Sequence, residues 1–225
     1  MKTVLITRPK YRAIELAKII KQEGYKPIIS SVLEYKEIKD NYSDINNYEA
    51  LVFSSPQGVK VFSKNSMVRD KEAITVGDKT AEIAKQNGFD KIISASGDNN
   101  DLEKLITNKY KNKRLLHICN EYSEISNLDK KIIYKTVPTN NLSNITKDLI
   151  ISNKINYITI LSRKTGEEFI KILKDNNLLT YSLYTPIICI SYNSSIPFRE
   201  SGFSNIAISS KPDVSSIIST LKNLD

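Results

Sequence analysis

The sequence has no tryptophan, a single histidine, two cysteines and only seven glycines among its 225 residues. No two glycines are spaced as Gly-x-Gly, so the sequence lacks the glycines that dinucleotide fingerprints and P-loops need for close backbone approach to phosphate. Cys119 and Cys189 lie far apart in apolar runs, which favours free, buried thiols. Two isolated cysteines and one histidine also argue against a zinc site, and we expect no metal.

Long hydrophobic runs are missing as well. No apolar stretch approaches the roughly eighteen residues that would cross a membrane. The first one ends at Ile6, before Thr7-Arg8-Pro9, which is too short for a signal peptide and typical of a buried strand. We therefore expect a cytoplasmic protein that has no membrane partner.

The chain also lacks the Gly-x-Ser-x-Gly elbow of many serine hydrolases. Its one histidine, His117, lies inside a strand pattern, which favours a core or sheet-edge residue over a catalytic base. A Ser-His-Asp hydrolase would need His117 within reach of Ser55 or Ser162, and this is the weakest of the functional alternatives.

Positive charge is in excess, and the chain has a net charge of +8. A general enrichment in lysine explains this value, and so does attraction of a polyanionic ligand through the summed field. The basic residues are scattered and not interleaved with aromatic residues, so only the charge itself favours a nucleic-acid partner. A small molecule that carries many carboxylates fits the charge equally well.

Short apolar segments alternate with helical patterns along the chain, which predicts parallel sheets that are covered by helices on both faces. Ligands of such sheets bind beyond the carboxyl ends of the strands. The expected strands are residues 3–7, 26–30, 49–54, 73–76, 91–94, 114–118, 132–137, 157–161, 186–191 and 205–208. The expected helices are residues 11–23, 80–86, 101–108, 142–151, 167–174 and 211–224, with another through 59–62 and with Pro212 in the first turn of the last one.

Two β-rich stretches, residues 31–38 and 131–137, have no helix that belongs to them. They predict two linker strands between domains, with domain 1 formed by residues 1–33 and 137–225 and domain 2, residues 38–130, inserted into it. The alternative is that both stretches are ordinary edge strands of one domain.

One short pattern occurs twice. Residues 51–59 (LVFSSPQGV) and 160–166 (ILSRKTG) each read as a strand that ends at a serine before a helix, and a phenylalanine follows Ser55 and Ser162 at the same distance in both copies. Helix N-termini attract anions, because their first amides lack partners and the macrodipole is positive there. The repeat therefore predicts two similar anion-binding turns.

Six segments share the order and spacing of one known family along nearly the whole chain. They are Leu5-Ile6-Thr7-Arg8-Pro9 with the helix and Gly24 that follow, the turn in residues 50–59, Val76-Gly77-Asp78-Lys79-Thr80-Ala81 with Gly88, Ile133-Tyr134-Lys135-Thr136, the turn at Ser162, and Lys211-Pro212. Together they resemble the uroporphyrinogen-III synthase family, although none of them is specific alone.

This resemblance implies an α/β fold of two parallel-sheet domains, the second inserted into the first, which a two-stranded β-ladder joins. It implies a lyase (hydro-lyase) of porphyrin and heme biosynthesis that uses no cofactor. The substrate, the linear tetrapyrrole hydroxymethylbilane, would be cyclised to uroporphyrinogen III with inversion of ring D in the cleft between the domains. The resemblance further implies a monomer, and it makes the upstream bilane-forming enzyme a candidate partner.

The resemblance also implies roles for single residues. Tyr134 matches the linker tyrosine of the family and is the candidate proton donor for loss of the substrate hydroxyl; the alternative is a cross-strand aromatic residue. Arg8 follows a strand, where it meets a substrate carboxylate or simply starts the first helix. The remaining candidate substrate contacts, each of which could equally be a turn or helix-capping residue, are Ser55, Gln57, Gly58, Gly77, Thr80, Ser162 and Thr165.

The sequence departs from the family pattern after residues 186–190. A Gly-x-x-Thr-Ala turn is expected there, but the chain has Ser191-Tyr192-Asn193-Ser194-Ser195, so that Ser194 or Ser195 would have to supply the hydroxyl. Gly166 also falls one position after the usual glycine of its turn. The degenerate turn at residues 191–195 favours the main alternative function, a non-catalytic two-lobed module that binds an anionic small molecule.

Overall fold

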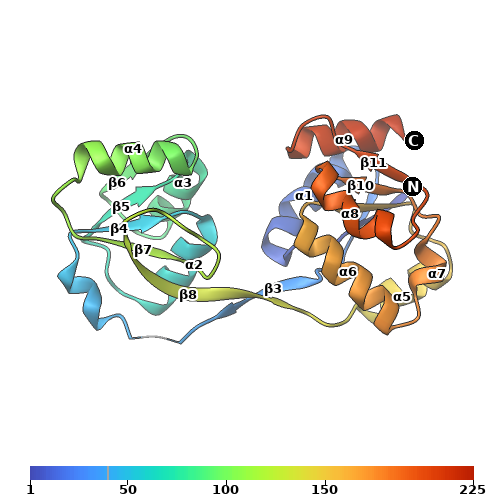
Figure 1. The fold of residues 1–225 in the computed structure, drawn as a ribbon, viewed down its shortest axis with the longest axis horizontal. Helices are drawn as coiled ribbons and strands as arrows, with labels where there is room; N and C mark the ends of the chain where they lie inside the picture. The colour runs from blue at the N-terminus through green and yellow to red at the C-terminus, as the bar shows by residue number, and fades with distance from the viewer. Residues whose placement is uncertain (40) are drawn as a thin grey trace. The chain divides into compact units, whose positions relative to one another are not determined.

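The computed structural model describes residues 1–39 and 41–225; residue 40, inside the expected domain 38–130, lies outside the described residues. The chain divides into two compact units. Unit 1 comprises Met1–Glu34 and Val137–Asp225, and unit 2 comprises Tyr35–Thr136. Each unit has its own sheet and its own helices (Figure 1).

Unit 1 is built on a parallel sheet with the strand order β11-β10-β9-β1-β2. The parallel α/β fold that the alternation predicts is confirmed here. The strands are β1 (Thr3–Ile6), β2 (Lys26–Ile29), β9 (Tyr157–Ile160), β10 (Ile187–Cys189) and β11 (Ile206–Ile208), and the helices are α1 (Lys10–Gln22), α5 (Asn144–Ile151), α6 (Arg163–Asp175), α7 (Leu179–Ser182), α8 (Tyr192–Glu200) and α9 (Val214–Asn223).

Both faces of the unit 1 sheet are covered, because β1 and β9 bury every residue. Leu16 of α1 and Ile217 of α9 belong to one apolar cluster. Phe169 of α6 and Phe198 of α8 belong to the other.

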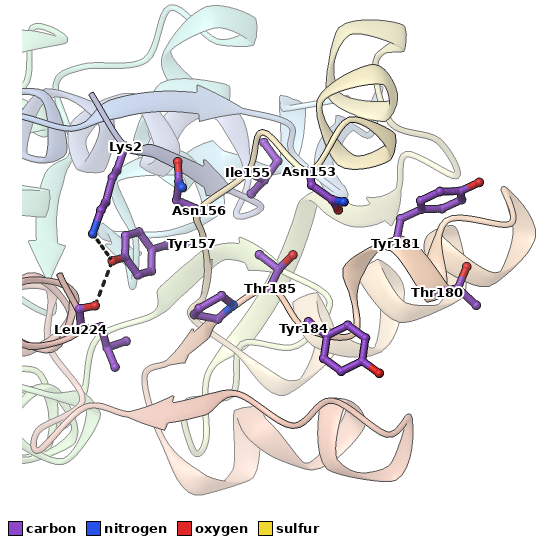
Figure 2. A pocket seen from close by; sticks show the side chains of 11 residues that line it. Lys2, Asn153, Ile155, Asn156, Tyr157, Thr180, Tyr181, Tyr184, Thr185 and Leu224 are labelled. Atoms are coloured by element: carbon purple, nitrogen blue, oxygen red, sulfur yellow. Dashed lines mark hydrogen bonds between the residues drawn. The ribbon is translucent and has the colours of Figure 1, made fainter.

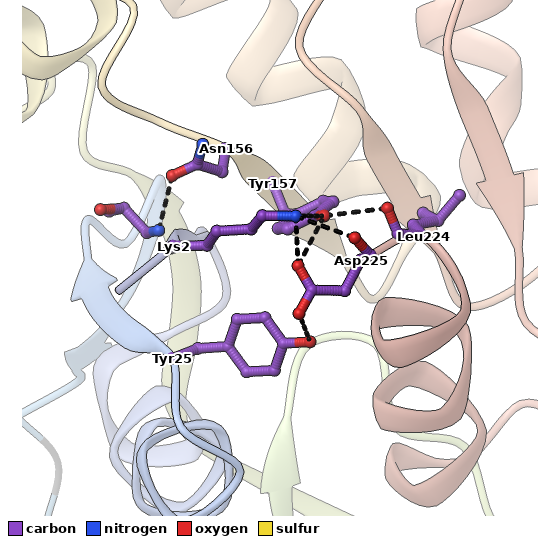
Figure 3. A network of polar contacts seen from close by, with 7 residues as sticks. Lys2, Tyr25, Asn156, Tyr157, Leu224 and Asp225 are labelled. Carbon is purple, nitrogen blue, oxygen red and sulfur yellow. Dashed lines mark hydrogen bonds and ion pairs between the residues drawn. The ribbon is translucent and has the colours of Figure 1, made fainter.

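Polar contacts fasten the amino edge of this sheet to the end of α9 (Figure 3). Lys2 forms an ion pair with Asp225 and donates to the Tyr157 hydroxyl, which itself donates to the Leu224 carbonyl at 3.0 Å. The Tyr25 hydroxyl donates to the Asp225 carboxylate at 3.1 Å. The Lys2 ammonium holds the pKa of the Asp225 carboxyl below its usual value. These contacts tie the first strand to the last helix.

Unit 2 has the strand order β3-β8-β7-β4-β5-β6, and the pairs from β8 to β6 are parallel. Helices α2 and α3 contribute to the apolar cluster on one face, and α4 contributes to the cluster on the other. The elements are β3 (Leu33–Glu37), a 3-10 helix (Ser43–Asn47), β4 (Ala50–Phe53), α2 (Pro56–Asn65), β5 (Glu72–Thr75), α3 (Asp78–Gln86), β6 (Ile92–Ser94), α4 (Asn99–Lys109), β7 (Leu115–Asn120) and β8 (Asp129–Pro138).

The two β-rich stretches form β3 and β8, which are neighbours at one end of the six-stranded sheet. The Ile38 amide donates to the Ile133 carbonyl at 2.9 Å, and the Thr139 amide donates to the Val32 carbonyl at 3.0 Å. The unit boundaries fall within these strands, at residues 34/35 and 136/137. The chain therefore passes between the units along β3 and β8.

Two helix expectations need correction, and two helices, α7 and α8, were not expected. Helix α9 begins at Val214 with the Asp213 carboxylate as its N-cap, so Pro212 precedes the helix and does not lie in its first turn. Helix α6 begins at Arg163, directly after Ser162, and not at residue 167. Helix α8 was not expected, because its run of serines and its internal Pro197 hide the helical pattern; a capping box between Ser191 and Ser194 starts it.

Candidate functional site

The carboxyl edge of the unit 2 sheet gathers most of the expected site residues. Strands β4, β5 and β7 are parallel, so the segments that follow them emerge at the same edge. Ser55, Gln57 and Gly58 lie where α2 begins after β4. Gly77 and Thr80 lie where α3 begins after β5.

Tyr134 reaches this edge through an irregularity in β8. Asn120 at the end of β7 pairs with Tyr134, whereas Cys119 pairs with Ile132, so the register shifts by one residue between them. A bulge of this kind re-aims side chains, and here Ile133 and Tyr134 are both buried although they are consecutive in a strand. The Tyr134 ring packs edge-on against Tyr35 with a centroid distance of 5.4 Å.

The hydroxyls of Tyr134 and Ser55 form a hydrogen bond of 2.9 Å. The Ser55 oxygen also accepts the Gly58 amide at 3.1 Å, which makes Ser55 the N-cap of α2. One of the two hydroxyl hydrogens is used between Ser55 and Tyr134, and the other can reach a third group. The aromatic packing and the hydroxyl contact exist together, so the two interpretations of Tyr134 do not exclude each other.

The N-termini of α2 and α3 differ in charge. No acidic residue occupies the first turn of α2. In contrast, α3 begins with Asp78, and hydrogen bonds from Ser94 and Ser96 hold the pKa of this carboxyl below its usual value. The anion-attracting end of α3 is therefore already countered by a carboxylate. Of the two turns, the one at Ser55 suits an anionic ligand better.

A second polar cluster lies at the same edge of unit 2, and sequence reasoning assigned no functional role to it. His117 of β7 contacts the Ser54 hydroxyl through Nε2 at 2.9 Å. Ser54 lies 2.8 Å from the Ser123 hydroxyl, and Ser123 lies 3.5 Å from His117 Nε2. The sequence does show a histidine near the end of one predicted strand and serines after two predicted strands. It does not show that these residues meet, because the order of β4 and β7 in the chain does not reveal that the two strands are neighbours in the sheet.

His117 is a fully buried residue, as the core interpretation expected. Burial, assisted by the positive charge of Lys130, lowers the pKa of its imidazole to about 4, so the ring is neutral near pH 7. Its Nδ1 atom is buried and has no hydrogen-bond partner among residues 1–39 and 41–225. Because no carboxylate supports Nδ1, and because His117 contacts Ser54 rather than Ser55 or Ser162, this is not a hydrolase triad.

Unit 1 places Arg8, Ser162 and Thr165 at the carboxyl edge of its own sheet. Arg8 follows β1, and Ser162 follows the neighbouring strand β9. The Ser162 oxygen accepts the Thr165 amide at 3.2 Å, and the Ser162 and Thr165 hydroxyls lie 2.7 Å apart. Arg163 is the first residue of α6, whose first turn carries no acidic residue. This turn is thus a capped helix N-terminus whose first residue, Arg163, forms an ion pair with Glu167 of the same helix, with 2.8 Å between Nε and Oε1.

The serine-rich turn after β10 also forms a capped helix start. Ser191 accepts the Ser194 amide at 3.3 Å, and the hydroxyl of Ser194 donates to the Ser191 carbonyl at 2.8 Å. The Ser195 hydroxyl donates to the Tyr192 carbonyl at 2.7 Å. Both hydroxyls expected to replace the missing threonine are therefore engaged inside α8 itself.

A cavity of about 540 Å³ lies at the opposite edge of the unit 1 sheet (Figure 2). Its wall includes Lys2, Asn156 and Pro186, which precede β1, β9 and β10, together with Tyr181 and Tyr184. It therefore shares no residue with the turns at the carboxyl edge.

Both cysteines are free and buried, as the apolar runs predict. Burial raises the pKa of the Cys119 thiol to about 11 and that of Cys189 to about 12, so neither is a reactive thiolate near neutral pH. Within residues 1–39 and 41–225, no three His, Cys, Asp or Glu side chains come together as metal ligands. None of the described helices is both long and apolar enough to cross a membrane.

Comparison with known proteins assigns the chain to a family. The family model for uroporphyrinogen-III synthase HemD matches residues 14–219. A uroporphyrinogen-III synthase homologue of Methanocaldococcus jannaschii is 30% identical over 195 residues, which cover 80% of this chain and 72% of the homologue. The porphyrin biosynthesis protein HemD of Ruminiclostridium josui is 26% identical over 198 residues, covering 76% of this chain and 39% of that protein.

Solved structures show the same fold. The uroporphyrinogen-III synthetase of Helicobacter pylori superposes with a TM-score of 0.65 at 15% identity and covers 100% of both chains. A mutant uroporphyrinogen III synthase of Thermus thermophilus gives a TM-score of 0.51 at 10% identity, covering 99% of this chain and 98% of the other.

Proposed function

The chain belongs to the uroporphyrinogen-III synthase family of enzymes in porphyrin biosynthesis, and we propose that it converts hydroxymethylbilane to uroporphyrinogen III with inversion of ring D. The reaction removes one water. The carbon–oxygen bond of the hydroxymethyl group breaks, and the freed carbon bonds to the α-carbon of ring D that already carries the bridge to ring C, which gives a spiro intermediate. The bond from this α-carbon to the ring C bridge then breaks, and the bridge carbon bonds to the other α-carbon of ring D, which inverts the ring and loses its hydrogen as a proton. The proton that leaves with the hydroxyl is returned when the ring system loses a proton at the end.

The observation that carries this proposal is the hydrogen bond between the hydroxyls of Tyr134 and Ser55 at the carboxyl edge of unit 2. Loss of hydroxide needs a proton donor, and a positioned phenol can supply one. A proton that leaves Tyr134 toward the substrate can be replaced from Ser55 through the same hydrogen bond. In this role Tyr134 is the general acid, and Ser55 holds its hydroxyl in place.

The capped turns supply the binding groups. The oxygens of Ser55 and Ser162 already accept hydrogen bonds from backbone amides of their helices. These turns can therefore offer a ligand their hydroxyl hydrogens and the other amides of the first helical turn. Such donors suit carboxylates, of which the bilane carries eight. Arg8, Gln57, Gly58, Gly77, Thr80 and Thr165 remain the further predicted contacts. The position of the substrate between the two units, the monomeric state and the upstream enzyme as a partner also stay predictions.

The test is a coupled assay in which hydroxymethylbilane is generated in situ and the products are oxidised and separated as I and III isomers. Dominance of the III isomer supports the synthase. Appearance of only the spontaneous I isomer would contradict it and favour the non-catalytic module for an anionic small molecule. A Ser126→Ala variant, changed outside the predicted site, serves as the matched control and is expected to retain activity.

A further inference from the structure

The cluster of His117, Ser54 and Ser123 has a feature that core packing does not require. Three polar side chains from two neighbouring strand ends form a closed triangle, with distances of 2.9, 2.8 and 3.5 Å. His117 is fully buried at its base, whereas Ser54 and Ser123 are only half-buried. The triangle therefore leads from the core of unit 2 toward the carboxyl edge, where Ser55 also lies.

The tautomer of His117 decides which way the hydrogen bonds of this triangle run. A neutral imidazole carries one N–H group and one acceptor nitrogen. If the hydrogen were on Nδ1, a buried N–H group would have no partner, because Nδ1 contacts no acceptor in the part of the chain that the structure describes. Orphaned buried N–H groups are rarer in proteins than acceptors that lack a partner. The hydrogen is therefore expected on Nε2, where Ser54 accepts it.

The position of this hydrogen limits the directions of the hydrogen bonds between His117, Ser54 and Ser123. Once Ser54 accepts from His117, its own hydrogen is available for Ser123, and Nε2 no longer offers a lone pair to either serine. One of the two serine hydrogens is then used between Ser54 and Ser123, and the other has no acceptor within the triangle and can donate only to a group outside it. Where Ser54 donates to Ser123, that outward donor is Ser123. In the opposite tautomer the chain would run inward, and Ser123 would present only an acceptor.

We propose that His117 is a positioning residue that orders the hydroxyls of Ser54 and Ser123, so that Ser123 donates a hydrogen bond to a carboxylate of the substrate. This inference rests on the proposed function and extends its binding site along the carboxyl edge of the unit 2 sheet, from Ser55 after β4 to Ser123 after β7. The net charge of +8 brings a polyanion to the protein, and the ordered hydroxyl selects an acceptor at this place.

The first test reads the tautomer directly. His117 is the only histidine in the chain, so selective nitrogen-15 labelling of histidine gives the signal of a single residue. At pH 7 we expect the hydrogen on Nε2, and we expect this signal to move when uroporphyrinogen III, the product, is added. The Ser123→Ala variant should weaken that response. A hydrogen on Nδ1 would overturn the proposal.

The second test separates binding from catalysis. Ser123→Ala should raise KM about tenfold with kcat unchanged within about twofold, as for the loss of one hydrogen bond to a charged group. His117→Phe should have the same effect, whereas His117→Gln retains an N–H donor and should restore most of the affinity. Ser54→Thr keeps the hydroxyl and should resemble the wild type, unlike Ser54→Ala. Ser126→Ala is the matched control in the same loop.

The two tests distinguish the failure of this inference from that of the proposed function. An active wild-type protein whose KM is unchanged by Ser123→Ala would overturn the role of the triangle alone. A wild-type protein that makes no III isomer would overturn the synthase, and the dissociation constant of uroporphyrinogen III for the Ser123→Ala variant would then decide the carboxylate contact. If His117→Phe does not fold, Ser123→Ala and Ser54→Thr carry the comparison.

Discussion

Ser55 in unit 2 and Ser162 in unit 1 end equivalent strands and cap equivalent helices, but their hydroxyls pair with different partners. Ser162 pairs with Thr165, three residues along its own helix. The residue three positions after Ser55 is Gly58, which has no side chain, and the pairing hydroxyl comes from Tyr134 on another strand. The capping serine thus pairs with a hydroxyl of its own helix in unit 1, whereas in unit 2 it pairs with the phenol of a residue on a different strand.

The buried polar residues of the two units also differ in chemical type. Among the described residues of unit 1, the buried polar side chains are serines and threonines, together with the hydroxyl-bearing Tyr25 and Tyr157. Unit 2 buries His117 and Lys131 as well, and Lys131 forms an ion pair with Asp44 at 2.9 Å. Among the described residues, buried histidine and lysine side chains therefore occur only in unit 2, whereas unit 1 buries hydroxyl groups and the Cys189 thiol.

The largest expected effect on stability is a loss in acid that originates in unit 2. The folded protein holds the pKa of His117 at about 4, below the ordinary value of 6.5. The unfolded state therefore binds the proton more readily, and the stability from this group, complete above pH 6.5, is lost as the pH falls toward 4. Between pH 7 and pH 4.5 this amounts to about 2.5 kcal/mol.

Urea denaturation of the wild type and of His117→Gln at these two pH values measures the effect. The free energy of unfolding of the wild type should fall between pH 7 and pH 4.5 by about 2.5 kcal/mol more than that of the variant. Equal losses in the two proteins would show that His117 is already exposed to protons in the native state.

The second effect is catalytic and should separate the two hydroxyl pairs. Tyr134→Phe keeps the ring that packs against Tyr35 but removes the proposed proton donor, so kcat should fall about 100-fold. Thr165→Val removes the pairing hydroxyl of unit 1 and should raise KM instead. Tyr35→Phe is the control for a lost phenol outside the site. If Tyr134→Phe kept its kcat, the tyrosine would be only a packing residue.

The third effect concerns the glycines that follow the two caps. A Cβ atom at Gly166 would lie 2.9 Å from the Phe198 ring and 3.3 Å from the Ser194 carbonyl oxygen, so α6 and α8 would have to move apart. Such overpacking should make Gly166→Ala less stable by about 1–2 kcal/mol. At Gly58 the nearest atom, the Ile118 carbonyl oxygen, is 3.1 Å away, and Gly58→Ala should cost less. Thermal unfolding of both variants checks the order, which the opposite ranking would contradict.

The sequence predicts those features of the two units that depend on local patterns. Alternating strands and helices, and the serines that end β4 and β9, can be read locally, because caps and buried strands depend on neighbouring residues. Helix α8 is missed because serines and Pro197 weaken its helical pattern, although its capping box is present.

The pairing of distant residues could not be read in the same way. Tyr134 meets Ser55 because a register shift at Asn120 turns it toward the sheet edge. His117 meets Ser54 because β7 and β4 are neighbours although two other strands separate them in sequence. The resemblance implied a role for Tyr134, whereas nothing in the local pattern marked Ser54 or Ser123.

The smallest expected effect tests whether the unit 1 cap is mainly structural. Ser162→Ala removes the acceptor of the Thr165 amide and should lower the free energy of unfolding by about 1 kcal/mol, the usual cost of a lost N-cap. Ser162→Thr keeps an acceptor and should recover most of that stability. Ser55→Ala should cost a similar amount for its cap, but it should also lower kcat, because Tyr134 loses the hydroxyl that positions it. A kcat that falls equally in Ser162→Ala and Ser55→Ala would mean that the two turns share the chemistry, and the division of roles between the units would have to be abandoned.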